Sequence, residues 1–329
     1  MLTLQELQRE ASATGFRAEI IEKVLHLVGL LKALGAHPAL RDSHALKGGT
    51  ALNLFTLRTP RLSVDVDINY IGAADRETML AQRPVIDQAI GQVCQREGLQ
   101  VRRIPSEHAG GKWRLSYLSA AGQPGKLELD LNYMHRVPLW PVNPGDSHPL
   151  AGTRARAVPI LDIHELAAGK LTALFSREAS RDLFDTRELL KLEAIDTAKL
   201  RLAFVVYGGM SRRDWRDIAV SDVDTTPTDV DRMLVPVLRR DLAPDRRTLD
   251  EWTHRLVADC RSLLSKLLPL NPDERTFVEE LNESGAIRPE LLTSDPEMQE
   301  TIRNLPGLKW KAVNVRKHRG LSEPHPDER

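Results

Sequence analysis

The chain has 329 residues, 41% hydrophobic and 28% charged, which is typical of a globular protein with room for two domains. The 46 basic residues balance 46 acidic ones, so no net field draws the whole molecule to a polyanion. The two cysteines stand far apart and no apolar run approaches about 18 residues. These features disfavour a zinc site, a disulfide framework, secretion and a membrane span, and they favour the cytoplasm.

Hydrophobic periodicity predicts alternating helices and strands over the first half of the chain. The expected elements are a helix at 20–34, a helix at 50–55, a strand at 64–70, a helix at 79–97, and strands at 99–104, 113–118 and 126–133. Gly48-Gly49 predicts a turn that runs into the second helix, and Gly110-Gly111 predicts a turn between the strands on either side of it.

The strand at 64–70 carries two acids in an alternating pattern. Asp65 and Asp67 would share one face, roughly 7 Å apart at Cα, while Val66 and Ile68 bury the other. Hard cations such as Mg²⁺ are held by one or two carboxylates plus substrate phosphates. The pair therefore indicates a metal site for phosphoryl transfer. The alternative is a charged strand edge with two solvated acids.

The strand at 126–133 alternates leucine with polar residues and contains a third acid, Asp130. Asp130 could join the first two carboxylates, or it could be a solvent-facing acid beside Glu128. An Asn-Tyr pair closes both acidic strands, at 69–70 and at 132–133.

A loop rich in Gly, Pro, Asn and Ser is expected over 138–159. Asp162 with Glu165 forms a capping-box pattern, so a helix should begin at the next residue. Ser180 is expected to cap a second helix that begins at Arg181.

Charged residues recur on one side of these two helices, at Lys170, Arg177, Arg181 and Asp185. The neighbouring residues are apolar, which indicates deep packing and a charged cleft rather than the alternative, a salt-bridged solvated face. Lysine there could meet a triphosphate as a point charge, and arginine could grip phosphate in a fork.

The chain beyond residue 196 reads as helical, with expected helices at 197–204, 230–240, 249–268 and 272–282. The basic cluster with the fewest interleaved acids lies near residue 319 and consists of Lys309, Lys311, Arg316, Lys317 and Arg319. We expect a first domain at 1–195, a helical domain at 196–317, and a disordered tail at 318–329.

Three motifs lie between residues 45 and 190. They are Lys47-Gly48-Gly49-Thr50, Arg61-x-Ser63-x-Asp65-x-Asp67, and Lys170-Leu171-x-Ala173-x-x-x-Arg177-x-x-x-Arg181-Asp182-x-x-Asp185. The first two are shared across the DNA polymerase β-like superfamily, and the third is narrower. Together they resemble the nucleotidyltransferase toxins of the AbiEii type, including their mycobacterial MenT relatives. The resemblance implies an α+β fold, in which a mixed sheet flanked by helices precedes a C-terminal helical bundle.

The same resemblance implies a function. Such a protein would be the toxin of a toxin–antitoxin or phage-defence pair and would transfer a nucleoside monophosphate from NTP, with release of pyrophosphate. The metal would be Mg²⁺, or Mn²⁺ in its place. The expected acceptor is the 3′ end of tRNA, whose extension blocks translation, and a cognate antitoxin would be encoded nearby. No membrane partner is expected.

Roles follow for the residues that match the motifs. Asp65 and Asp67 would hold the metal, with Asp130 as a further ligand or a general base. Lys170 and Asp185 would be further catalytic residues. The residues expected to bind nucleotide or phosphate are Lys47, Gly48, Gly49, Thr50, Ser63, Lys170, Arg177, Arg181 and Asp182. Thr50 and Ser63 could instead cap a helix or pin a turn.

Two alternatives stay open at this point. The acceptor could be a protein hydroxyl or a small molecule, with the same chemistry at phosphorus. The chain could also be a non-catalytic regulator that binds NTP, although the intact set of Asp65, Asp67, Lys170 and Asp185 argues against a degenerate site.

Overall fold

The structure is a computed structural model that describes residues 2–103, 110–177 and 179–321. The chain forms two compact units, and each is described by itself. Unit 1 comprises residues 1–162 and 226–253, and unit 2 comprises 163–225 and 254–329. These units differ in extent from the expected domains 1–195 and 196–317, which stay a prediction.

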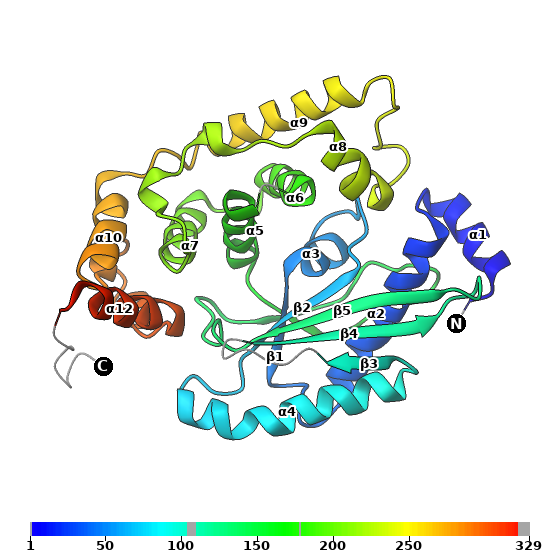
Figure 1. Ribbon diagram of the computed structural model, residues 1–329, viewed down its shortest axis with the longest axis horizontal. Helices are drawn as coiled ribbons and strands as arrows, with labels where there is room; N and C mark the ends of the chain where they lie inside the picture. Colours follow the sequence, from blue (N-terminus) through cyan, green and yellow to red (C-terminus); the bar gives the residue numbers. More distant parts are fainter. Residues whose placement is uncertain (1, 104–109, 178, 322–329) are drawn as a thin grey trace. The chain divides into compact units, whose positions relative to one another are not determined.

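Unit 1 is built on one seven-stranded mixed sheet (Figure 1). Its strands are β1 (His44–Lys47), β2 (Asp65–Tyr70), β3 (Gln100–Arg103), β4 (Gly110–Leu118), β5 (Pro124–Asn132), β6 (Asn143–Gly145) and β7 (Val158–Ile160). They lie in the order β3-β4-β5-β2-β1-β7-β6. The pairs β2–β5 and β1–β7 are parallel, and the other neighbours are antiparallel. The predicted mixed sheet is confirmed.

Helices lie on both sides of this sheet (Figure 1). The helices of unit 1 are α1 (Leu4–Thr14), α2 (Ala18–Ala36), α3 (Gly48–Ala51), α4 (Arg76–Arg96) and α8 (Pro227–Asp229). Figure 1 shows α4 along one side of the strands and α3 on the other. Alternation along each strand separates the faces, so that leucines of β5 are buried while Glu128 and Asp130 are half-buried on the opposite side.

The repeated Asn-Tyr pair follows from the parallel pairing of β2 with β5. Asn69 lies opposite Asn132 in the register. The next residues, Tyr70 and Tyr133, turn to the apolar face, where their ring centroids are 5.2 Å apart. Their hydroxyls donate to Gln82 and Asp87 of α4, respectively. The tyrosine pair thus ties two central strands to the covering helix.

The returning segment 226–253 completes unit 1. It contains α8, a π-helical turn at Val230–Leu234 and a 3₁₀ turn at Val235–Val237. The Leu62 amide donates to the Val237 carbonyl at 2.8 Å, and the Arg239 amide donates to the Pro60 carbonyl at 3.1 Å. Residues far apart in sequence therefore fix the chain that enters β2.

Unit 2 is helical. Its helices are α5 (Ile163–Arg177), α6 (Ser180–Leu190), α7 (Thr197–Gly209), most of α9 (Leu249–Leu264), α10 (Pro272–Glu283), α11 (Pro296–Arg303) and α12 (Pro306–Arg319). An aromatic cluster of Phe175, Phe204 and Trp215 forms part of its core, with ring centroids 5.1 to 6.0 Å apart. Of the helices expected beyond residue 196, those at 197–204, 249–268 and 272–282 correspond to α7, α9 and α10.

Several expected elements differ from those in the structure. Gly110 and Gly111 belong to β4 and not to a turn, since they pair with Asn132 and Leu131 of β5. Glycine at position 110 lets the strands approach, because a Cβ there would overlap the Leu131 carbonyl oxygen. The expected loop at 138–159 contains β6 and the start of β7. The expected helix at 230–240 is two short turns, with Pro236 lacking an amide donor.

Two helix ends also differ from expectation. Ser180 lies in the first turn of α6, whose N-cap is Ala179, with no side-chain capping bond. Helix α12 continues to Arg319, so the first residues of the expected tail at 318–329 are helical. The rest of that expected tail, 322–329, lies outside the described residues.

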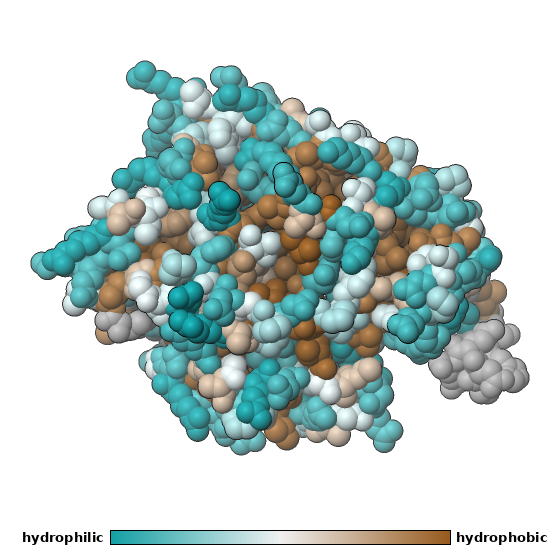
Figure 2. Space-filling model, turned by 180° about the vertical axis from the view of Figure 1, so that it is seen from behind, coloured by the Kyte–Doolittle hydropathy of each residue, from teal (hydrophilic) through white to brown (hydrophobic). Residues whose placement is uncertain are grey.

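Hydrophilic side chains cover much of the face shown in Figure 2, with apolar side chains visible between them. Among the described residues, no helix is both long enough and apolar enough to cross a membrane.

Candidate active site

Four charged residues stand in one row across the middle of the unit 1 sheet. Lys47 of β1 lies opposite Asp67 of β2, Asp67 lies opposite Asp130 of β5, and Asp130 lies opposite Lys112 of β4. Residues directly opposite one another on neighbouring strands share a face of the sheet. The row therefore brings two carboxylates together and sets one lysine on either side of them.

The environment of this row raises the pKa of one of its two carboxyl groups, Asp130. Burial, and then the charge of Asp67, raise the pKa of Asp130, while Lys47 and Lys112 oppose the rise. The Lys112 ammonium lies 3.7 Å from Asp130 Oδ2 and 3.2 Å from Glu128 Oε2. Burial would lower the pKa of Lys112, but the carboxylates of Glu128, Asp130 and Asp67 outweigh burial and raise it. Negative charge thus predominates between the two lysines.

Asp65 belongs to the next row, opposite Glu128 of β5, and Glu128 lies opposite Arg114 of β4. Asp65 and Asp67 are two positions apart along β2, so both face the same side of the sheet, as predicted. The start of β2 is held because the buried Thr50 hydroxyl donates to the Asp65 carbonyl at 2.5 Å. The hydroxyl of Thr50 is therefore used to pin the strand.

The paired acids suit a divalent cation. Repulsion between Asp67 and Asp130 would be relieved by a positive ion, and two carboxylates with phosphate oxygens and water are the donor set that Mg²⁺ uses. Among the described residues, however, no group of three or more His, Cys, Asp or Glu side chains is gathered as a complete metal cage. The substrate would have to supply the other ligands.

Gly48 and Gly49 form a tight turn between β1 and α3. Gly48 has φ +70°, a region that favours glycine, and a Cβ built there would overlap Asp67 Oδ2. A Cβ on Gly49 would lie 2.8 Å from Ser63 Oγ and 3.1 Å from a guanidinium nitrogen of Arg61. The absence of both side chains lets the acid and the buried arginine approach the first turn of α3.

The third motif forms a second charged cluster, in unit 2. Lys170 of α5 donates to Asp182 Oδ1 at 2.7 Å and forms an ion pair with Asp185 Oδ2 at 2.9 Å. The Lys170 side chain is 8% exposed, and both aspartates of α6 are buried. Arg177 adds two bonds to Asp182, at 2.5 and 3.0 Å. Two acids and two cations thus balance within one cluster.

The cations of this cluster stabilise the charged form of Asp182. Burial would raise the pKa of Asp182, but Lys170 and Arg177 outweigh burial and hold the pKa below its usual range. The Arg177 side chain is 64% exposed, so its outer edge faces solvent. Arg181 is half-buried on α6. The predicted deep packing of the charged helices is seen here, and α5 and α6 bring Lys170, Asp182 and Asp185 together.

Sequence reasoning missed three residues near these groups. Lys112 follows Gly110-Gly111, a pair that predicts a turn, so the sequence pattern leaves it outside the strand that begins at residue 113. Arg61 stood in the second motif without an assigned role, and it is 2% exposed beside Gly49. His135 follows β5, where its amide donates to Asn132 Oδ1. Burial, and then Lys47, lower the pKa of His135, so its ring is neutral at pH 7.

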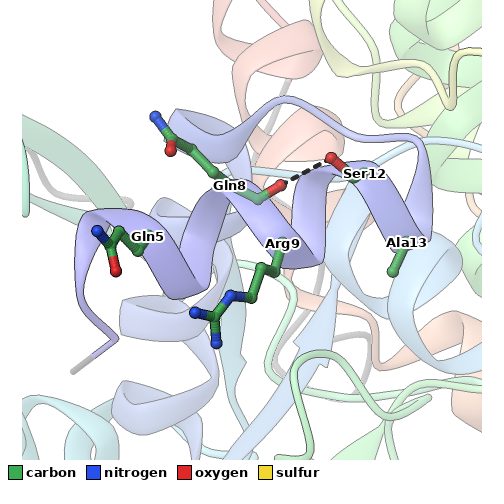
Figure 3. Close-up of a pocket in the computed structure, with 5 residues that line it drawn as sticks. All are labelled: Gln5, Gln8, Arg9, Ser12 and Ala13. Carbon is green, nitrogen blue, oxygen red and sulfur yellow. Dashed lines mark hydrogen bonds between the residues drawn. The ribbon is translucent and has the colours of Figure 1, made fainter.

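A separate hollow on α1 carries no comparable chemistry (Figure 3). Its five lining residues all lie on that one helix, and Arg9 is the only charged residue among them. The Ser12 hydroxyl donates to the Gln8 carbonyl at 3.0 Å, as Figure 3 shows. The charged row and the Lys170 cluster remain the candidates for the reaction.

Comparison with known proteins adds an independent finding. A family model described as "Nucleotidyl transferase AbiEii toxin, Type IV TA system" matches residues 29–283. No curated protein sequence matches. Among solved structures, MenT4, a nucleotidyltransferase toxin from Mycobacterium tuberculosis H37Rv, is similar at 19% identity with a TM-score of 0.56, over 94% of this chain and 99% of that chain. At that identity the likeness shows the fold.

Proposed function

This chain belongs to the AbiEii family of nucleotidyltransferase toxins of type IV toxin–antitoxin systems, and from that premise we propose that it extends the 3′ end of tRNA. Membership confirms the resemblance inferred from the three motifs. The protein is a nucleotidyltransferase that uses NTP, and it has a cognate antitoxin. The acceptor, the metal and the roles of individual residues are the parts that we propose here.

In the proposed reaction, the tRNA 3′ hydroxyl attacks the α-phosphorus of NTP. A bond forms between that oxygen and phosphorus, the bond from the α-phosphorus to the bridging oxygen breaks, and pyrophosphate leaves. The hydroxyl gives up its proton. We assign that proton to Asp130, because its raised pKa makes its carboxylate a stronger base than an ordinary aspartate.

The observation that best supports this proposal is the row of Lys47, Asp67, Asp130 and Lys112 across the sheet. Paired carboxylates can hold a divalent cation next to phosphate oxygens on which negative charge develops during the reaction. We propose that Asp65 and Asp67 hold Mg²⁺, with Asp130 beside them. The ion, when bound, would neutralise charge on the attacking and leaving oxygens.

The glycine turn and the buried Arg61 are proposed to receive the phosphates. Backbone amides at the start of a helix point outward, and glycine lets a phosphate approach them closely. Arg61 adds a buried positive charge next to Gly49. Lys47 stands at the end of β1, opposite Asp67.

In unit 2, we propose that Lys170 contacts the triphosphate. Asp182 and Asp185 hold its ammonium group at 2.7 and 2.9 Å, which fixes its position. In this arrangement Asp185 and Asp182 are positioning residues. Arg177 and Arg181 offer guanidinium groups to phosphate.

The experiment that tests this function uses purified protein, deproteinised total RNA, Mg²⁺ and each α-labelled NTP in turn. We expect label on tRNA-sized RNA, and a loss of about 100-fold or more with Asp67→Asn or Lys170→Met. Asp231→Asn, which changes an exposed acid on the returning segment, is the matched control and should keep full activity. The same assay is repeated in a cell lysate, where label that appears only on protein or on small molecules would refute the RNA acceptor.

A further inference from the structure

A second cationic region lies on the same polar face of the unit 1 sheet, toward its β3 edge. It surrounds a cavity of about 730 Å³ lined by residues of β3, β4 and β5. Three cations line this cavity, Arg102, Arg114 and Lys126, against one carboxylate, Glu128. In a chain whose charges cancel, this is a local excess of positive charge.

The charges around the cavity are only partly paired. Glu128 accepts contacts from two cations, Lys112 at 3.2 Å and Arg114 at 3.4 Å. Within residues 2–103, 110–177 and 179–321, neither Arg102 nor Lys126 forms an ion pair or a side-chain hydrogen bond, and both side chains are exposed. Two cations are therefore available to an anionic ligand.

The cavity and the acid pair lie along the same strand, β5. Along β5, Lys126, Glu128 and Asp130 alternate onto the polar face, so Lys126 lies about 13 Å from Asp130 at a rise of roughly 3.3 Å per residue. Arg114 lies opposite Glu128, between these two positions. Positive groups thus continue from Lys112, beside Asp130, to the cavity at Lys126 and Arg102.

We propose that this surface binds the phosphodiester backbone of the acceptor RNA strand, with its terminal hydroxyl at Asp67 and Asp130 and its preceding nucleotides over Arg114, Arg102 and Lys126. The proposal rests on the proposed function. A single small anion would need one cluster of donors, whereas these cations are spread along the strands. The cavity volume lies within the range of about 300–1,000 Å³ that holds nucleotide-sized groups.

Glu128, the carboxylate that lines the cavity, does not prevent a phosphate backbone from lying there. Glu128 is neutralised by Lys112 and Arg114, so it does not repel phosphate as a lone acid would. Arg114 is 64% exposed and can turn one edge of its guanidinium to phosphate while the other stays with Glu128. The RNA strand can therefore lie along β4 and β5.

The test is a binding measurement with no NTP and no divalent cation. Fluorescence anisotropy with labelled tRNA over a range of salt concentrations compares the wild type with an Arg102→Gln, Lys126→Gln double variant. Glutamine keeps the polar stem in place. Arg9→Gln, Arg96→Gln is the charge-matched control, since both arginines are exposed and lie on α1 and α4, away from the polar face.

We expect the double variant to bind tRNA at least 10-fold more weakly and its salt slope to fall by about 1.4, the value for two lost phosphate contacts. The control should match the wild type. A salt slope that the double variant leaves unchanged, with circular dichroism confirming its fold, would overturn the inference. A wild type that binds no RNA would overturn it as well.

A kinetic arm separates this inference from the proposed function. At saturating RNA, we expect the double variant to keep the wild-type kcat and show a raised KM for RNA and an unchanged KM for NTP. If the wild type labels no RNA, the proposed acceptor fails while the salt slope still decides the inference. A lower kcat with unchanged KM for RNA contradicts a binding surface.

Discussion

Asp67 is fixed from two directions by single residues. Asp130 stands opposite Asp67 in the neighbouring parallel strand, and Gly48 leaves the space that the Asp67 carboxylate fills on the other side. Gly48 also has φ +70°, so position 48 requires glycine both for its backbone conformation and for the space beside it. An acid that is placed this closely can present its oxygens to a ligand without rearrangement.

A Gly48→Ala substitution tests this arrangement. The new methyl group would displace the Asp67 carboxylate and strain the backbone, so we expect a loss of about 1–3 kcal/mol of stability and a drop in transfer rate of about 100-fold. Gly35→Ala is the control, because Gly35 lies in α2 with open space around it. Urea unfolding and the labelling assay measure the two effects. Equal activity of both variants would contradict the role of Gly48.

Asp130 supplies a prediction about pH. Its folded-state pKa is raised, so its protonated form stabilises the fold below the unfolded pKa near 3.8, and this stability is lost as pH rises through the folded pKa. Asp130→Asn should therefore raise the melting temperature at pH 7 by about 1–2 °C in the absence of divalent cations. It should also remove the acidic limb of the rate profile and lower the rate. Asp231→Asn should change neither quantity.

At the scale of elements, α5 and α6 are joined through buried charge. Lys170 on α5 meets Asp182 and Asp185 on α6, and none of the three side chains is more than 8% exposed. Breaking a buried ion pair leaves an uncompensated charge, which costs more than the pair contributes to stability. The cluster therefore couples the packing of two helices to the position of one lysine.

Asp182→Ala should destabilise the protein by about 3–5 kcal/mol in urea unfolding. The pKa of Asp182 is lowered in the fold, so its contribution is present above the unfolded pKa near 3.8 and is lost as pH falls through the folded pKa. Arg177→Gln should cost no more than about 1 kcal/mol, because the arginine is mostly exposed. A similar loss for both variants would contradict a buried cluster organised around Asp182.

The sequence predicted those elements whose pattern is local. Alternation located β2 and β5, and helical spacing located α2, α4 and α5. It did not reveal β6 and β7, which are three residues each and obtain their hydrogen bonds from distant strands. The motifs singled out Asp65 and Asp67, and strand alternation added Asp130, but the pairing of Asp67 with Asp130 depends on strand register, which no local pattern specifies.

At the scale of the whole molecule, unit 1 is assembled from two separate stretches of chain. Residues 226–253 return to it after the chain has formed α5, α6 and α7 of unit 2. An isolated bridge between Arg61 and Leu238, with the bond from the Leu62 amide to Val237, holds the chain ahead of β2. Sequence pattern alone does not show that residues 226–253 belong to unit 1, so it predicts a single boundary after residue 195.

Two fragments distinguish the two divisions. Fragment 1–253 contains all of unit 1, whereas fragment 1–195 lacks the returning segment and its bonds to Pro60 and Leu62. We expect 1–195 to unfold at a lower urea concentration than 1–253 and to show poorer dispersion of its amide NMR signals. Equal stability of both fragments would support the boundary after residue 195.

The returning segment has a consequence for the order in which the toxin is made. A ribosome that has synthesised residues 1–162 has produced every strand of the sheet, including Asp65, Asp67 and Asp130. The contacts of Pro60, Arg61 and Leu62 with residues 237–239 form only after some 75 further residues have been translated. The chain that enters β2 therefore gains these contacts only after all three acids have been made, and a harmful enzyme stays incomplete until late in its own synthesis.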